Sequence, residues 1–186
     1  MFRPSMFLLL LAAPAAAASA QSHDMGEWTL APMPDGCMLQ AVSPQGTMLS
    51  IWGRAGEEEL GFLLQNRGWN ALRDGQSYQL QVAFTGRRSW PIAATAREHI
   101  DSDGPGYFFN MEPGAATTGG FLEALASARG MNISRDGHEV DSVPLVGSRE
   151  AMGALARCLS ESWAEASAPA EAPEAATPET PELPST

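Results

Sequence analysis

The 186-residue chain contains no lysine, and all eleven of its basic side chains are arginines. The absence of lysine excludes a P-loop, because that motif needs a lysine on the bound phosphates. It also excludes Schiff-base catalysis by a lysine amine and serine–lysine catalytic dyads. Twenty-two acidic residues outnumber the arginines, so the formal net charge is −11. Sequence-independent nucleic-acid binding depends on neutralising phosphates, and the acidic balance therefore argues against a nucleic-acid partner.

Cysteine and histidine are scarce as well, with two cysteines and three histidines in the whole chain. The two cysteines, Cys37 and Cys158, lie far apart, so there is no Cys-x-x-Cys pair of the kind that carries redox activity. In an oxidising compartment the pair predicts one disulfide that joins the first strands to the last helix. Closing so long a loop would stabilise the fold by roughly 4–5 kcal/mol.

The first twenty residues have the features of a secretory signal peptide. Arg3 supplies the positive charge, residues 6–13 form a short apolar run, and residues 18–20 provide the small side chains of a cleavage site. Pro14 ends the apolar run well before the roughly 20 residues that a membrane span requires. We therefore predict cleavage after residue 20, a periplasmic or secreted location, and no transmembrane anchor after cleavage.

The end of the chain, residues 164–186, differs in composition from the rest. It consists almost entirely of Ala, Glu, Pro, Ser and Thr, and it includes five prolines and five glutamates. Such a segment buries too little apolar area to offset the entropy of ordering it, so we predict a disordered tail. Residues 21–163 are then expected to form one domain.

The periodicity of the domain predicts an α+β fold that is rich in β-structure. Residues 78–84 alternate apolar and polar side chains and give the clearest strand signal. A helix is expected at 119–129 with Gly130 as its C-terminal cap, and a last helix is expected to begin at Ser148. The predicted architecture is an antiparallel meander, either a sandwich or a partly closed barrel, with two helices in the C-terminal half. Its expected strands are 27–30, 37–42, 47–52, 60–65, 78–84, 90–95, 107–111, 131–135 and 138–143.

Two of the histidines could serve a hydrolase. His99 and His138 each lie in sequence beside carboxylates, so either could act as a general base. Both also flank glycine-centred turns, where aspartate is favoured because it bonds to the backbone. The hydrolase interpretation is therefore the alternative, and we expect no catalytic residue set and no cofactor.

The third histidine, His23, would be the third residue of the mature chain. A free amine, two backbone amides and this imidazole could form a square-planar site for copper(II) or nickel(II). Cyclisation of the N-terminal glutamine would remove the amine. A periplasmic metal binder is thus a second alternative.

Four tryptophans are spread over the predicted strand region. We expect most of Trp28, Trp52, Trp69 and Trp90 to belong to the core, and aromatic platforms for a glycan are the functional alternative.

The two ends of the domain resemble the invasion-associated locus B family of small exported bacterial proteins. The resemblance rests on Gly26-Glu27-Trp28 and on residues 143–148 running into Ala151. It implies a β-rich periplasmic protein without an established catalytic activity. We therefore predict an exported, non-catalytic binding or scaffold module whose partner is an envelope protein or a glycan.

Overall fold

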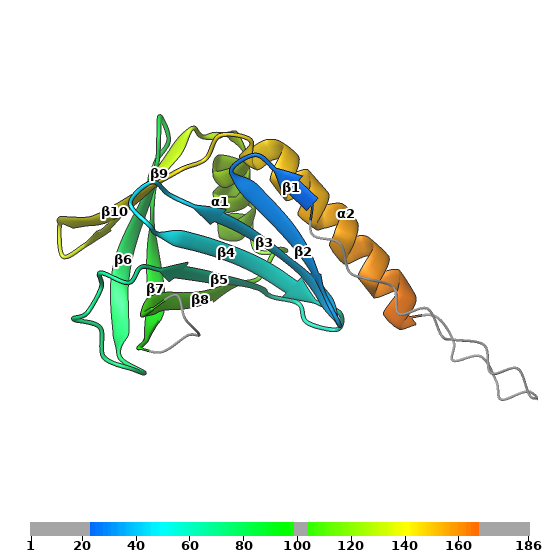
Figure 1. Cartoon of the computed structure of the whole chain (residues 1–186), viewed down its shortest axis with the longest axis horizontal. Helices are drawn as coiled ribbons and strands as arrows, with labels where there is room; N and C mark the ends of the chain where they lie inside the picture. Colours follow the sequence, from blue (N-terminus) through cyan, green and yellow to red (C-terminus); the bar gives the residue numbers. More distant parts are fainter. Residues whose placement is uncertain (1–22, 99–103, 168–186) are drawn as a thin grey trace, which may run out of the picture.

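The computed structural model describes residues 23–98 and 104–167. Within these ranges the chain forms ten strands and two helices (Figure 1). The strands are β1 (His23–Met25), β2 (Trp28–Met33), β3 (Gly36–Val42), β4 (Met48–Arg54), β5 (Leu60–Gln65), β6 (Ser77–Phe84), β7 (Ser89–Arg97), β8 (Gly106–Met111), β9 (Gly130–Arg135) and β10 (His138–Pro144). The helices are α1 (Ala116–Ser127) and α2 (Ser148–Ser167).

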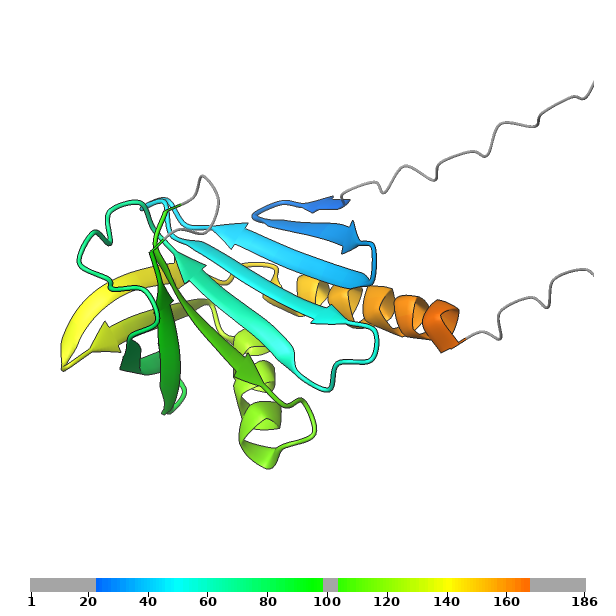
Figure 2. The same cartoon turned by 90° about the horizontal axis from the view of Figure 1, so that it is seen from below.

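All ten strands belong to one antiparallel sheet in the order β1-β2-β3-β4-β5-β8-β7-β6-β9-β10. The sheet is strongly curved but not closed, because β1 and β10 remain at its two edges (Figures 1 and 2). The predicted β-rich α+β class with two late helices is confirmed. Most strands pair with the strand that precedes or follows them in the sequence. The exceptions are the pairing of β5 with β8 and the pairing of β6 with β9.

The strand with the clearest sequence signal shows how the core forms. In β6 the apolar side chains of Leu80, Val82 and Phe84 are buried, whereas the intervening Gln79 and Gln81 are exposed. Successive side chains of a strand point to opposite faces, so the alternation places one face against the core. The same alternation continues in β7, where Trp90, Ile92, Ala94 and Ala96 are buried.

The helix α2 packs on β2, β3 and β4 along the concave side of the sheet (Figure 1). Leu159 contacts Gly53 so closely that a Cβ at position 53 would lie 3.0 Å from its methyl groups. The predicted disulfide between Cys37 and Cys158 is confirmed, with a Cα–Cα distance of 6.1 Å, and it joins β3 to α2. The expected start of this helix at Ser148 is confirmed as well.

The other helix, α1, fills the space between the two halves of the sheet. The ring of Phe121 lies 5.0–6.5 Å from those of Phe62, Phe84, Trp90 and Phe109, mostly edge-on. Aromatic pairs prefer such geometries because ring edges are positive and ring faces negative. The helix therefore supplies the central residue of an aromatic core.

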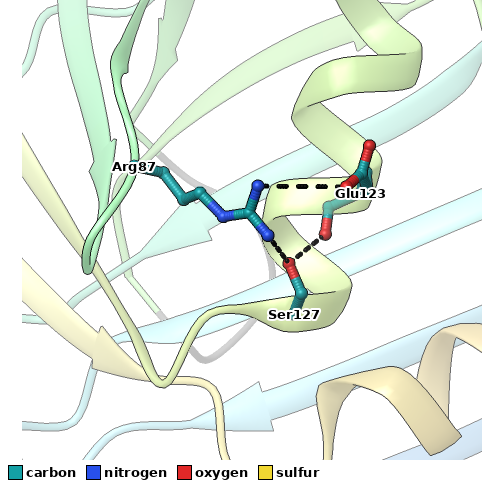
Figure 3. Close-up of polar contacts among 3 residues, drawn as sticks. All are labelled: Arg87, Glu123 and Ser127. Atoms are coloured by element: carbon teal, nitrogen blue, oxygen red, sulfur yellow. Dashed lines mark hydrogen bonds and ion pairs between the residues drawn. The ribbon is translucent and has the colours of Figure 1, made fainter.

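The outer face of α1 is tied to the loop between β6 and β7 (Figure 3). Arg87 donates a hydrogen bond from Nη2 to the Ser127 hydroxyl at 3.2 Å, and its Nη1 lies 3.9 Å from Glu123 Oε1. The Ser127 hydroxyl in turn donates to the carbonyl of Glu123 at 2.6 Å. These groups are largely exposed, so they orient the loop more than they stabilise it.

The predicted bounds of α1 were wrong. The helix begins at Ala116 and ends at Ser127, and Gly130 is the first residue of β9 rather than a helix cap. Ala128 is already extended, and the carbonyl of Gly130 accepts hydrogen bonds from the backbone and hydroxyl of Thr85. A Cβ at position 130 would lie 3.3 Å from that hydroxyl, so close strand contact explains this glycine.

The predicted tail boundary also changes, because α2 continues through residues 164–167 before the described part of the chain ends. Alanine and glutamate favour a helix, and the first proline of the tail comes only at position 169. The predicted signal peptide, the rest of the tail and residues 99–103 lie outside the described residues.

The two segments that carry the family resemblance touch each other. The indole of Trp28 donates a hydrogen bond to the carbonyl of Val146 at 2.9 Å. Trp28 is fully buried, so this contact anchors the connection between β10 and α2 over the N-terminal hairpin. The resemblance to the invasion-associated locus B family stays a prediction.

Candidate functional site

The structure does not assemble a hydrolase site around His138. This residue lies at the exposed tip of the β9–β10 hairpin, and in the described part of the chain no hydrogen bond joins it to Asp141. His99 falls in the segment 99–103, which is outside the described residues. The backbone of His23 lies in β1 opposite Leu30, and its side chain is outside the description. Among the described residues, no group of three histidine, cysteine or acidic side chains could hold a metal ion.

The carboxylate of Asp141 has a structural partner set instead. It accepts hydrogen bonds from the hydroxyl of Thr47 and, at 3.1 Å, from the amide of Asn66. Asn66 also donates to the Thr47 hydroxyl at 2.8 Å. Thr47 is fully buried, so this network links β10 to the β3–β4 turn and to the loop after β5.

That loop carries Trp69, and Asn66 shapes it. The side-chain oxygen of Asn66 accepts a hydrogen bond from the backbone N–H of Gly68 at 2.7 Å. The backbone carbonyl of Asn66 accepts one from the N–H of Trp69 at 3.1 Å. This turn is typical of asparagine, which bonds to the backbone two residues ahead. Leu72 is buried and anchors the far end of the loop, so Trp69 is held in a fixed place.

A cavity of about 220 Å³ opens beside Trp69, and we call it the Trp69 pocket. Its walls come from three parts of the chain, namely the loop after β5, strand β8, and the β9–β10 hairpin. The lining residues are Gly68, Trp69, Asn70, Ala71, Leu72, Tyr107, Arg135 and Val140.

Aromatic rings and one guanidinium form the polar end of the Trp69 pocket. The rings of Trp69 and Tyr78 lie 5.2 and 5.6 Å from the ring of Tyr107. Arg135 donates a hydrogen bond to the Tyr107 hydroxyl at 2.8 Å, and its guanidinium stacks 5.0 Å from the centre of the Tyr78 ring. Arginine so held presents its remaining N–H groups in a fixed orientation.

The environment of Tyr107 changes the acidity of its phenol. Burial raises the pKa of Tyr107 above its ordinary value of 10.0, because the phenolate would lose its hydration. The positive charge and the hydrogen bond of Arg135 act in the opposite direction but do not outweigh burial. At neutral pH the pocket therefore holds a neutral phenol beside a positive guanidinium.

Trp69 also lines a second cavity, of about 320 Å³, together with Asn70, Leu72, Glu98, Gly104 and Pro105. The indole thus lies between two hollows and is only half-buried, unlike Trp28 and Trp90, which belong to the core. A half-buried aromatic platform next to amide and guanidinium donors can stack on a planar or ring-shaped ligand and hydrogen-bond to its oxygens.

Sequence reasoning named Trp69 only as one of four tryptophans that could form a glycan platform, and it missed Tyr107 and Arg135. Both occur in predicted strands, and neither lies near Trp69 in the sequence. Tyr107 and Arg135 come together because β6 pairs with β9 and β8 pairs with β7 in the same sheet. One feature of the sequence could have drawn attention to Arg135. It is the last residue of a strand that is otherwise uncharged.

No protein-family model, curated protein or solved structure that was compared with the chain matches it.

Proposed function

We propose that the protein is an exported, non-catalytic binding module of the bacterial envelope, and that it binds a glycan in the Trp69 pocket. The pocket carries the proposal, because it combines a half-buried indole with the side chains of Asn70 and Arg135. Apolar faces of sugar rings fit aromatic platforms, and their hydroxyls accept hydrogen bonds from guanidinium and amide groups.

The disulfide and the predicted signal peptide support export. Disulfides persist in oxidising compartments such as the periplasm and are rare in the cytosol. Among the described residues, neither helix combines the length and the apolar character needed to cross a membrane.

The proposal is tested by isothermal titration calorimetry with tetra-N-acetylchitotetraose, an uncharged N-acetylglucosamine oligomer that resembles a peptidoglycan strand. We expect binding to the wild-type protein and an affinity at least about fivefold lower for Trp69→Ala, since stacking contributes about 1 kcal/mol beyond the buried area. Arg135→Met should also weaken binding, because it keeps the side-chain length and removes the donors.

Trp52→Ala is the matched control. Trp52 stacks on Phe108 at 5.8 Å on the convex face of the sheet and is also half-buried, but it does not line the Trp69 pocket. Its removal should leave the affinity unchanged. Equal losses in Trp52→Ala and Trp69→Ala, or no binding by the wild-type protein, would refute the proposal.

A further inference from the structure

The side chain of Arg135 lies on the inner face of the curved sheet. Arg135 is directly opposite Leu80 in the pairing of β9 with β6, and Leu80 is fully buried. Residues that are directly opposed in antiparallel strands project from the same face, so the arginine shares the face that carries the core. Only 31% of its side chain is exposed, and Arg135 lines the Trp69 pocket. A positive charge therefore borders this pocket.

The two aromatic partners of this guanidinium are uncharged. Its Nη1 donates a hydrogen bond to the Tyr107 hydroxyl at 2.8 Å, and its central carbon lies 5.0 Å from the centre of the Tyr78 ring. Burial raises the pKa of Tyr107, so this hydroxyl keeps its proton at neutral pH. The phenol and the ring face therefore orient the guanidinium without neutralising its charge.

One carboxylate, that of Asp136, is paired with Arg135 in the described part of the chain. Its Oδ2 lies 3.8 Å from Nε of the arginine, and 84% of the aspartate side chain is exposed. An ion pair so exposed to water contributes little, so it competes weakly with a ligand. Within residues 23–98 and 104–167, no hydrogen bond involves Nη2 of Arg135. This nitrogen is therefore available to a ligand.

The two cavities beside Trp69 differ in charge. Among the described residues that line the Trp69 pocket, Arg135 is charged and none is acidic. The neighbouring cavity shares Trp69 and also borders the exposed Glu98. A ligand with one acidic group is therefore expected to place that group beside Arg135 rather than in the neighbouring cavity, because like charges repel.

We propose that the Trp69 pocket selects an acidic sugar, whose ring stacks on Trp69 and whose carboxylate accepts hydrogen bonds from Arg135. This preference presupposes the proposed glycan-binding function, of which it defines the ligand class. A guanidinium matches a carboxylate in shape, and hydrogen bonds between charged groups are about twice as strong as neutral ones. The cavity of about 220 Å³ is of the size of one sugar ring with its acidic substituent.

The preference is tested by isothermal titration calorimetry with two matched pairs of sugars. The first pair is the disaccharide of N-acetylglucosamine and N-acetylmuramic acid, as the free acid and as its carboxamide. The second pair is cellobiouronic acid and uncharged cellobiose. We expect the wild-type protein to bind at least one acid about tenfold more tightly than its uncharged counterpart. The two pairs distinguish a lactyl carboxylate from a uronic acid as the group that Arg135 binds.

Three variants separate the contribution of charge from that of stacking. Arg135→Met should abolish the preference, so that acid and uncharged sugar bind with similar affinity, because it removes the charge and keeps the side-chain length. Trp69→Ala should weaken both members of a pair by a similar factor and leave the preference in place. Asp136→Asn should strengthen binding of the acid about twofold by removing a like charge. Asparagine suits the φ of 55° at this position.

A measurement on the wild-type protein needs no variant, since high salt should reduce the preference by screening the charges. Equal affinities within both pairs, together with Trp69-dependent binding of tetra-N-acetylchitotetraose, would overturn the acidic preference and leave glycan binding intact. Retention of the preference in Arg135→Met would overturn the role of Arg135. Failure of the wild-type protein to bind any of these sugars would refute the proposed function and the acidic preference with it.

Discussion

At the scale of single residues, the absence of lysine means that the titration of tyrosine near pH 10 can be observed without overlap from lysine. Lysine and tyrosine are the side chains that normally titrate near pH 10, and this chain has only the two tyrosines, Tyr78 and Tyr107. Burial raises the pKa of Tyr107 in the folded state above 10.0. The folded protein therefore holds this proton more tightly than the unfolded chain does. The resulting stabilisation is complete below pH 10 and is lost as the pH rises through the folded-state pKa.

The variant Tyr78→Phe leaves Tyr107 as the sole tyrosine. We predict that the phenol of Tyr107 then titrates with a midpoint above pH 10.0, as measured by phenolate absorbance. Arg135→Gln in the same background should move the midpoint higher, because the arginine charge and hydrogen bond lower the pKa. Urea unfolding at several pH values provides a second measurement. Above pH 10 the free energy of unfolding should fall more steeply for the wild-type protein than for Tyr107→Phe. A midpoint at or below 10.0 would contradict the burial of this phenol.

The candidate site shows what a sequence conveys about single residues. The sequence could suggest Trp69 only together with Trp28, Trp52 and Trp90, since nothing in it showed which tryptophans lie outside the core. The roles of Tyr107 and Arg135 could not be predicted, because each depends on contacts between segments that are distant in the sequence. Asp141 illustrates the reverse case. Its position near His138 suggested catalysis, but its carboxylate is bound by Thr47 and Asn66.

At the scale of elements, period-two alternation predicted β6 well, because this strand has one face against the core. The strand β5 shows no such alternation, because all six of its residues are buried. The short strand β1 was missed, since three residues carry no periodicity. The start of α1 was missed because Ala116, Thr117 and Thr118 provide neither a capping side chain nor an acidic first turn.

The role of α1 as the centre of the aromatic core leads to a second prediction. Phe121→Ala should lower the free energy of unfolding by about 3–5 kcal/mol, because it removes a fully buried ring and leaves a cavity among four others. Urea denaturation followed by circular dichroism measures this change.

The matched control lies two residues further along the same helix. Glu123→Ala removes the exposed contact to Arg87 (Figure 3), and its effect should be no more than about 0.5–1 kcal/mol. If the two variants lost similar stability, burial of the Phe121 ring in the aromatic core would not explain the contribution of α1.

At the scale of the whole molecule, the curved sheet is held together by contacts between parts that are distant in sequence. The Asp141 network joins β10 to the β3–β4 turn, and Trp28 joins the N-terminal hairpin to the segment after β10. The disulfide between β3 and α2 adds a covalent link with a sequence separation of 121 residues. A sequence could predict this link from the count of cysteines and the predicted signal peptide, but not the curvature that brings the two ends together.

The third prediction concerns this covalent link. The double variant Cys37→Ala, Cys158→Ala should lose about 4–5 kcal/mol of unfolding free energy, because a loop of this length restricts the unfolded chain strongly. Reduction of the wild-type protein should lower the urea midpoint to a similar degree, which separates loss of the bond from loss of the side chains. Cys37 is fully buried whereas Cys158 is partly exposed, so reductant reaches the bond from the α2 side. An unchanged midpoint in reductant, or free thiols at both positions in protein isolated from the envelope, would contradict a stabilising disulfide and would remove the main structural support for export.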